Sequence, residues 1–108
     1  MSYNIVLSKQ ADEDIRAIYE YIAFELQSRE NAIGQLNRLE KEILSLEQMP
    51  ERFSLYKSEP WCSRNLRVMP VDNYLVFYIP DHDKKIINII RVMYGGRDIG
   101  TQLDLQTN

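Results

Sequence analysis

The chain has 108 residues, of which 44% are hydrophobic and 27% charged, so its composition is that of one globular domain spanning residues 1–108. Its single cysteine excludes a disulfide within the chain. No apolar run reaches the roughly 20 residues of a membrane-spanning helix. Because the N-terminus also lacks a basic and apolar leader, we expect a cytoplasmic protein without membrane contact.

The formal net charge of −3 is unevenly distributed. Residues 1–60 contain seven Lys or Arg against eleven Asp or Glu, a balance of −4, whereas residues 61–97 contain six against three, a balance of +3. The more basic half suits an anion or an acidic partner, although chance asymmetry of a solvated surface would look the same. A pI near 5.1 argues against strong nonspecific binding to nucleic acid.

The first half of the chain predicts a short strand followed by a helical hairpin. Residues 3–7 are typical of a strand, and Ser8 is placed to cap a helix whose apolar residues recur every three or four positions. The carboxylates of this helix are expected on a solvated face. After a break at residues 27–31, a second apolar stripe of the same period follows, and Pro50 ends it.

The second half predicts a loop and three strands. Residues 51–64 show no period and include three aromatic rings, which we expect to pin the loop to the domain. Strand-like runs follow at 65–70, 74–80 and 86–94, and the first two are joined by a tight turn at Asp72-Asn73. The order β-α-α-β-β-β predicts an α+β fold, a helical hairpin packed on a largely antiparallel sheet.

Two arginines within these strands are unusual for core strands. With the two-residue turn, Arg67 lies opposite Tyr78, and with a four-residue loop at 81–84, Tyr74 lies opposite Arg91. Both arginines then share one face, away from the helices. The residues of that face are Arg67, Met69, Tyr74, Tyr78, Arg91 and Met93.

The opposite face is then expected to pack beneath the helices. Asn88 falls on this face and fits it poorly, so a bulge or a slipped register remains open. Its other members are Leu66, Val68, Leu75, Phe77, Ile79, Ile90 and Val92.

Like charges held together favour a shared anion, because two neighbouring guanidinium groups repel each other. The anion could be a phosphate, a carboxylate of a partner, or an acid of this chain such as Glu59. Alternatively, Arg67 and Arg91 are each ion-paired inside the domain, with their stems over apolar surface.

Other residues give weaker signals. His82 lies in a charged turn and is expected to be solvated, and Cys62 is expected to be inert. No His or Cys spacing suggests a metal site, and the glycine patterns of nucleotide-binding loops are absent, so we expect neither metal nor cofactor. We expect Gly95-Gly96 to let the chain turn after the last strand.

Four segments together resemble the RelE/ParE superfamily of toxins from type II toxin–antitoxin systems. They are "VLSKQADEDIRAIYEYIAFEL", "LEQMPERF", "LRVMPVDNYLVFYIP" and "INIIRVMYGGRDI", and the likeness extends from about residue 4 to residue 103. The resemblance implies a helical hairpin on a curved antiparallel sheet, and a cognate antitoxin that wraps and blocks the toxin.

The resemblance implies two competing activities. ParE-like members poison DNA gyrase without a catalytic centre, and the long hairpin and the tail "RVMYGGRDI" favour this branch. In that case Arg67, Tyr74, Tyr78, Arg91 and Arg97 are candidates for binding the target or the antitoxin. Acidic antitoxin residues would then pair with Arg67 and Arg91.

RelE-like members instead cleave mRNA in the ribosome. Their activity would assign catalysis to Arg67, Arg97 and Tyr94, so whether the chain is an enzyme stays open. The full set of bases is not present, and the acidic composition suits a ribosome-binding protein poorly. A toxin-like binding module without activity is a third possibility.

Overall fold

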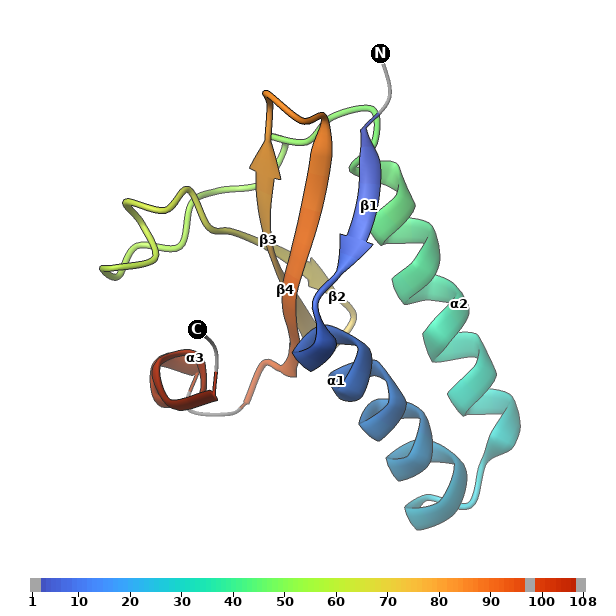
Figure 1. The fold of residues 1–108 in the computed structure, drawn as a ribbon. Coiled ribbons are helices and arrows are strands. Elements are labelled where there is room, and N and C mark those ends of the chain that lie inside the picture. Colours follow the sequence, from blue (N-terminus) through green and yellow to red (C-terminus); the bar gives the residue numbers. More distant parts are fainter. Residues whose placement is uncertain (1–2, 97–98, 107–108) are drawn as a thin grey trace.

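The computed structural model describes residues 3–96 and 99–106. Four strands form one sheet, and two long helices form a hairpin beside it (Figure 1). This is the predicted α+β architecture with one additional helix. In chain order the elements are β1 (Asn4–Leu7), α1 (Lys9–Glu20), the π-helical segment η1 (Tyr21–Glu25), α2 (Arg29–Ser45), β2 (Arg67–Val71), β3 (Tyr74–Asp81), β4 (Ile86–Tyr94) and α3 (Ile99–Gln106).

Both long helices begin at serines. The Ser8 side chain accepts a hydrogen bond from the Ala11 N–H at 2.9 Å, and Ser28 accepts one from the Asn31 N–H at 3.3 Å. Each bond satisfies an N–H that a helix start leaves without a partner within the helix. The cap predicted at Ser8 is confirmed, and the second cap starts α2 within the predicted break.

The sheet is mixed, with strand order β1-β4-β3-β2 and β1 parallel to β4. The antiparallel pairing of β2 with β3 confirms the predicted register, in which Arg67 lies opposite Tyr78. The pairing of β3 with β4 differs from the prediction. Tyr74 lies opposite Tyr94, three residues beyond the predicted partner Arg91.

Two features account for this difference. The loop between β3 and β4 begins one residue later than predicted, which moves the pairing by two residues and leaves side chains on their faces. A β-bulge adds one more residue, because Tyr78 pairs with Ile89 whereas its neighbour Phe77 pairs with Arg91. This one-residue step turns Arg91 to the face opposite Arg67. The predicted convergence of the two arginines is therefore wrong.

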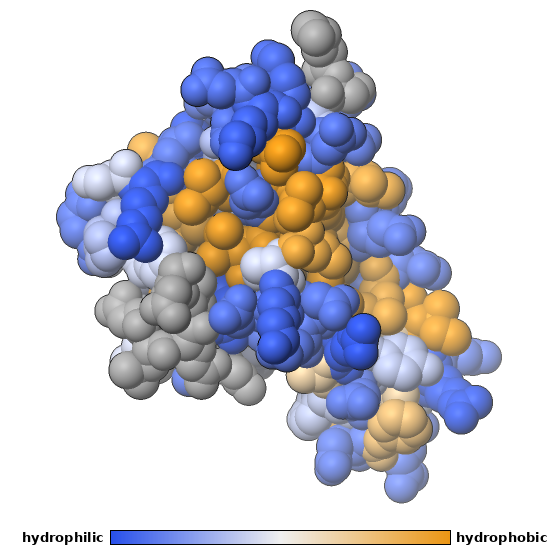
Figure 2. All heavy atoms as spheres, in the orientation of Figure 1, coloured by the Kyte–Doolittle hydropathy of each residue, from blue (hydrophilic) through white to orange (hydrophobic). Residues whose placement is uncertain are grey.

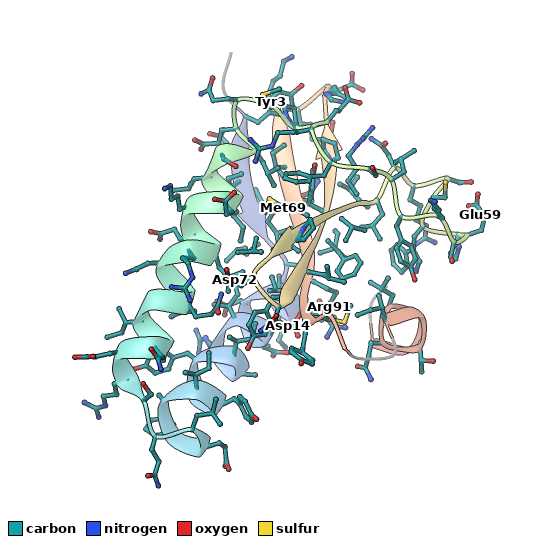
Figure 3. The ribbon with its side chains drawn as sticks, turned by 180° about the vertical axis from the view of Figure 1, so that it is seen from behind. Tyr3, Asp14, Glu59, Met69, Asp72 and Arg91 are labelled. Carbon is teal, nitrogen blue, oxygen red and sulfur yellow. The ribbon has the colours of Figure 1, made fainter. Side chains whose placement is uncertain are left out.

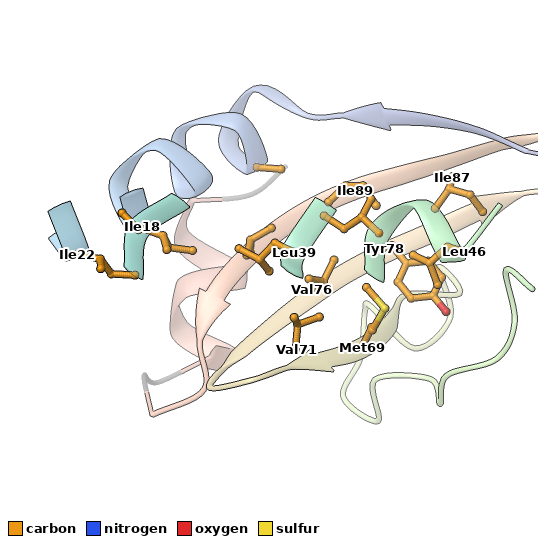
Figure 4. Close-up of a cluster of buried hydrophobic side chains, with 14 of the residues drawn as sticks. Ile18, Ile22, Leu39, Leu46, Met69, Val71, Val76, Tyr78, Ile87 and Ile89 are labelled. Atoms are coloured by element: carbon orange, nitrogen blue, oxygen red, sulfur yellow. The ribbon is translucent and has the colours of Figure 1, made fainter. Parts of the chain in front are cut away.

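The helices cover the face of the sheet that was predicted to be open. The main core lies between that face and the hairpin, where Ile18, Ile22, Leu39 and Leu46 point from the helical side (Figure 4). Of the residues predicted beneath the helices, only Val92 is a buried member of this main core, because the bulge turns its side chain to this face. The residues that the strands contribute are Met69, Val71, Val76, Tyr78, Ile87, Ile89 and Val92.

A second, smaller core lies on the other face of the sheet. The loop that carries Trp61 and the unpredicted helix α3 cover part of this face, and the Trp61 side chain confirms that the loop is pinned. The buried members of this core are Trp61, Leu66, Phe77, Met93 and Leu103.

In the part of the chain that the structure describes, no helix is long and apolar enough to cross a membrane.

The two outer strands of the sheet differ in their protection. The outer edge of β2 is bridged by the preceding loop, through the Tyr56 N–H to the Leu66 carbonyl at 2.8 Å and the Val68 N–H to the Ser54 carbonyl at 3.1 Å. Pro70 also removes a donor from this edge. Within residues 3–96 and 99–106, no strand pairs with the outer edge of β1. This edge can therefore accept another chain.

Candidate functional site

The arginine of β4 is bound inside the domain. Its side chain is 4% exposed, and its Nε and Nη2 donate to the two carboxylate oxygens of Asp14 at 2.7 and 2.9 Å (Figure 3). The same carboxylate accepts the Val92 N–H at 2.9 Å. Glu59, an acid considered from sequence, accepts a bond from the Ser63 N–H instead. The prediction of a solvated carboxylate is thus wrong for Asp14, and Arg91 already has an internal anion.

The start of α1 extends the edge of β4 where β1 ends. The Ser8 N–H donates to the Ile89 carbonyl at 2.9 Å, and its hydroxyl donates to the Ile90 carbonyl at 2.8 Å. These bonds satisfy backbone groups at the bulge, which would otherwise be unpaired. Because Ser8 also caps α1, one residue fixes both the helix start and the bulge that orients Arg91.

The arginine of β2 is also engaged within the domain. Nη1 of Arg67 donates to the Phe53 carbonyl at 2.7 Å, and Nη2 lies 3.3 Å from Oε2 of Glu51. Its Nε and the hydroxyl of Tyr78 are buried without a hydrogen-bond partner among the described residues. Burial raises the pKa of the Tyr78 hydroxyl, and the backbone of Phe53 and the positive charge of Arg67 partly oppose this rise. Arg67 therefore holds the loop after α2 against the sheet.

The only histidine is exposed, as the sequence predicted, and it has two partners. Nδ1 of His82 lies 2.6 Å from the Tyr3 hydroxyl, and Nε2 lies 3.4 Å from Oε2 of Glu51, which also contacts Arg67. This chain of contacts ties the start of β1, the turn before β4 and the loop after α2 together at one end of the sheet.

The remaining candidate residues lie at the other end of β3 and β4. Tyr74 and Tyr94 face each other with ring centres 5.9 Å apart and ring planes at 72°, and Tyr94 is 52% exposed. Burial raises the pKa of the Tyr74 hydroxyl, and the nearby phenols of Tyr21 and Tyr94 raise it further. Arg97 lies outside the described residues.

Of the residues considered for catalysis, the two that the structure describes, Arg67 and Tyr94, do not meet. Arg67 pairs with Tyr78 and Tyr94 pairs with Tyr74, so the two pairs lie four positions apart along β3. That separation is about 13 Å at roughly 3.3 Å per strand residue. Acid–base catalysis and stabilisation of a charged transition state need groups within hydrogen-bond reach of the same reacting atoms. Arg67 and Tyr94 cannot share one phosphate in this arrangement.

An apolar groove that the sequence did not reveal lies between β1 and the two long helices. The helical period shows an apolar stripe, but it does not show how much of that stripe the sheet covers. Apolar side chains also gather over the strands in Figure 2. The groove has a volume of about 390 Å³ and is lined by Ile5, Leu7, Ile15, Leu36, Leu39, Glu40, Ile43 and Leu44.

Sequence comparison identifies the family. The sequence profile described as "ParE toxin of type II toxin-antitoxin system, parDE" matches residues 5–99, from β1 to the start of α3. The chain belongs to the ParE toxin family. The predicted RelE/ParE membership, with ParE as the favoured branch, is thereby confirmed. A search of curated protein sequences found no significant match to this ParE-family toxin.

Solved structures of toxins share the fold of this ParE-family toxin. The chromosomal ParDE system from P. aeruginosa matches with a TM-score of 0.69 and 19% identity, over 86% of this chain and 96% of the other. The RelBE2 complex from Mycobacterium tuberculosis gives a TM-score of 0.65 and 16% identity, over 87% and 99%. A double mutant of E. coli RelE in the free state gives 0.64 and 12%, over 94% and 93%. Identities this low establish the fold alone.

Proposed function

We propose that this ParE-family toxin arrests growth by inhibiting DNA gyrase through protein contacts, and that a cognate antitoxin neutralises it. The observation that carries the proposal is the ParE family match over residues 5–99. The separation of Arg67 from Tyr94 supports it, because a protein-contact inhibitor needs no catalytic centre. The low pI supports it as well, since binding to ribosomal RNA favours a strong positive field.

The antitoxin docks on the groove beside β1. An extended segment can pair with the open edge of β1 while its alternate side chains enter the groove, which is a common mode of peptide recognition. Leu7 and Leu44 are 42% and 46% exposed there, so covering them removes apolar surface from water. Glu40 in the same groove favours a basic side chain on the segment. The structure lends no support to pairing of acidic antitoxin residues with Arg67 and Arg91.

The target contacts are assigned to the end of the sheet that carries Tyr94. Tyr94 is exposed. We assign Arg97, a candidate for target binding from the family resemblance, to the same contacts. We assign three other candidates, Arg67, Tyr78 and Arg91, to the stability of the fold. Arg67 donates to the Phe53 carbonyl, Arg91 pairs with Asp14, and the Tyr78 side chain is buried.

Purified toxin tests the activity directly. With gyrase and relaxed plasmid, we expect loss of supercoiling and accumulation of cleaved DNA, whereas mRNA in a ribosome-dependent translation reaction should stay intact. Cleaved mRNA together with unaffected gyrase at a large molar excess would replace the proposal by the RelE-like activity. Expression that is harmless without an antitoxin would leave an inactive binding module.

Antitoxin docking is tested with a matched pair of variants. Leu44→Glu places a charge in the groove, whereas Met49→Glu alters a side chain that is 55% exposed outside it. Co-expressed with the product of an adjacent small reading frame, Leu44→Glu should fail to co-purify and should stay toxic. Met49→Glu should co-purify and be neutralised. Equal behaviour of the two variants would exclude the groove as the docking site.

A further inference from the structure

Three tyrosines from distant parts of the chain lie near one another at one end of the sheet. Tyr21 begins η1, Tyr74 begins β3 and Tyr94 ends β4. Tyr74 and Tyr94 are in edge-on ring contact, and Tyr21 lies near enough to affect the ionisation of Tyr74. Tyr21 and Tyr94 are 55% and 52% exposed. We call these three residues the tyrosine surface.

The backbone around this surface is shaped to hold the rings. The Gly95 N–H donates to the Asn73 carbonyl at 2.8 Å, which closes the chain after β4. A Cβ on Gly96 would lie 2.6 Å from Cε2 of Tyr94, so the ring occupies space that only glycine leaves free. Tyr21 belongs to a π-helical turn, a rare form that often lies at functional sites. The paired glycines therefore do more than end a strand.

Two charged groups near the tyrosine surface are paired within the domain. Asp72 precedes Tyr74 in the chain and is bound by Arg38 at 2.7 Å, and Asp14 on α1 is bound by Arg91. The arginines of these two pairs are therefore engaged by carboxylates, whereas binding of nucleic acid depends on Lys and Arg at phosphates. Exposed tyrosines suit a protein surface instead, because each ring buries apolar area while its hydroxyl meets a polar group.

The tyrosine surface is separate from the groove beside β1. Ile15 lies on α1, and Tyr21 begins η1, which follows α1 directly. The two residues are six positions apart, which places them about 120° apart around the helix axis at roughly 100° per residue. Ile15 lines the groove and Tyr21 belongs to the tyrosine surface. A segment confined to the groove therefore leaves the exposed Tyr21 ring accessible.

We propose that the tyrosine surface is where this toxin contacts its target protein, and that it is distinct from the antitoxin groove. The proposal rests on the proposed function, which makes gyrase the target. The complementary surface on gyrase offers apolar side chains to the rings and hydrogen-bond partners to the hydroxyls. Antitoxin binding and target binding are then separable by mutation.

The test compares Tyr21→Ala and Tyr94→Ala with Met49→Ala, whose side chain is 55% exposed elsewhere on the molecule. Each tyrosine variant should raise the toxin concentration for half-inhibition of gyrase supercoiling by about tenfold or more, as truncation of an interface hot spot does. Gly96→Ala keeps every tyrosine but displaces the Tyr94 ring, so it should give a smaller loss. Met49→Ala should inhibit like the wild type.

The same proteins are titrated with the purified product of the adjacent small reading frame. Binding within about twofold of the wild type, with unchanged circular dichroism, is the expected result for all variants. Parallel loss of gyrase inhibition and antitoxin binding would overturn the separate surface, as would tyrosine variants that inhibit normally. A wild-type protein without effect on gyrase would overturn the proposed function and this assignment with it, whereas retained inhibition by the variants overturns the assignment alone.

Discussion

The ion pair between Asp14 and Arg91 gives a direct test of what holds α1 against the sheet. Asp14→Ala would remove the carboxylate that pairs with a guanidinium group that is 4% exposed, and would leave the Val92 N–H without its acceptor. Removing one partner of a buried ion pair costs about 3–5 kcal/mol. The total stability of a domain of this size is roughly 5–15 kcal/mol. We therefore expect the melting temperature to fall by more than about 10 °C.

Urea unfolding measures this cost. Trp61 is 5% exposed, so its fluorescence should report the transition, with circular dichroism as a second probe. Arg91→Met removes the charge but keeps an apolar stem. The double variant Asp14→Ala/Arg91→Met should therefore be more stable than Asp14→Ala alone, because it removes the buried positive charge together with the carboxylate. The matched control is Asp12→Ala, which breaks an exposed pair with Arg16 and should cost less than about 1 kcal/mol.

Two results would refute the reasoning. One is a cost for Asp14→Ala that is no larger than the cost for Asp12→Ala. The other is a double variant whose destabilisation equals the sum of the two single variants. Either outcome would mean that the Arg91 guanidinium does not depend on this carboxylate.

Three further substitutions test local features. Ser8→Ala removes the cap of α1 and the bond to the Ile90 carbonyl, and should lower the free energy of unfolding in urea by about 1–2 kcal/mol. Gly34→Ala should raise it by about 0.5–1 kcal/mol, because the new methyl group inside α2 meets only the flexible end of Arg38. Asp72 has φ 55°, which Asn tolerates, so Asp72→Asn isolates the charge that Arg38 binds. The bond from Arg38 lowers the pKa of Asp72, so its stabilisation is complete above the unfolded pKa of about 3.9 and is lost as the pH falls through the lower folded value. The wild type should thus be the more stable protein at about pH 6, and the two urea midpoints should converge toward about pH 2; a gap that stays constant with pH would contradict this.

Features that depend on neighbouring residues could be predicted from the sequence alone. The apolar period and the Ser8 cap placed α1, because both act within one or two helical turns. The two-residue turn at Asp72 set the pairing of β2 with β3, because a tight turn fixes its own register. The family resemblance rested on these same local segments.

The face of the sheet that the helices cover could not be predicted from local sequence patterns. Both faces carry apolar side chains in alternation, so the period distinguishes two faces without choosing between them. The misfit of Asn88 was the available signal, since it pairs with Ile79 on the face that the hairpin leaves open.

The position of Arg91 likewise depended on contacts that no local pattern contains. Its carboxylate partner lies 77 residues away, and a single bulge residue turns it from one face to the other. A bulge is stable here because α1 begins where β1 ends and Ser8 satisfies the backbone of β4. Local periodicity fixes which residues are apolar and where elements begin, whereas the pairing of elements far apart in the chain fixes where each charged group points.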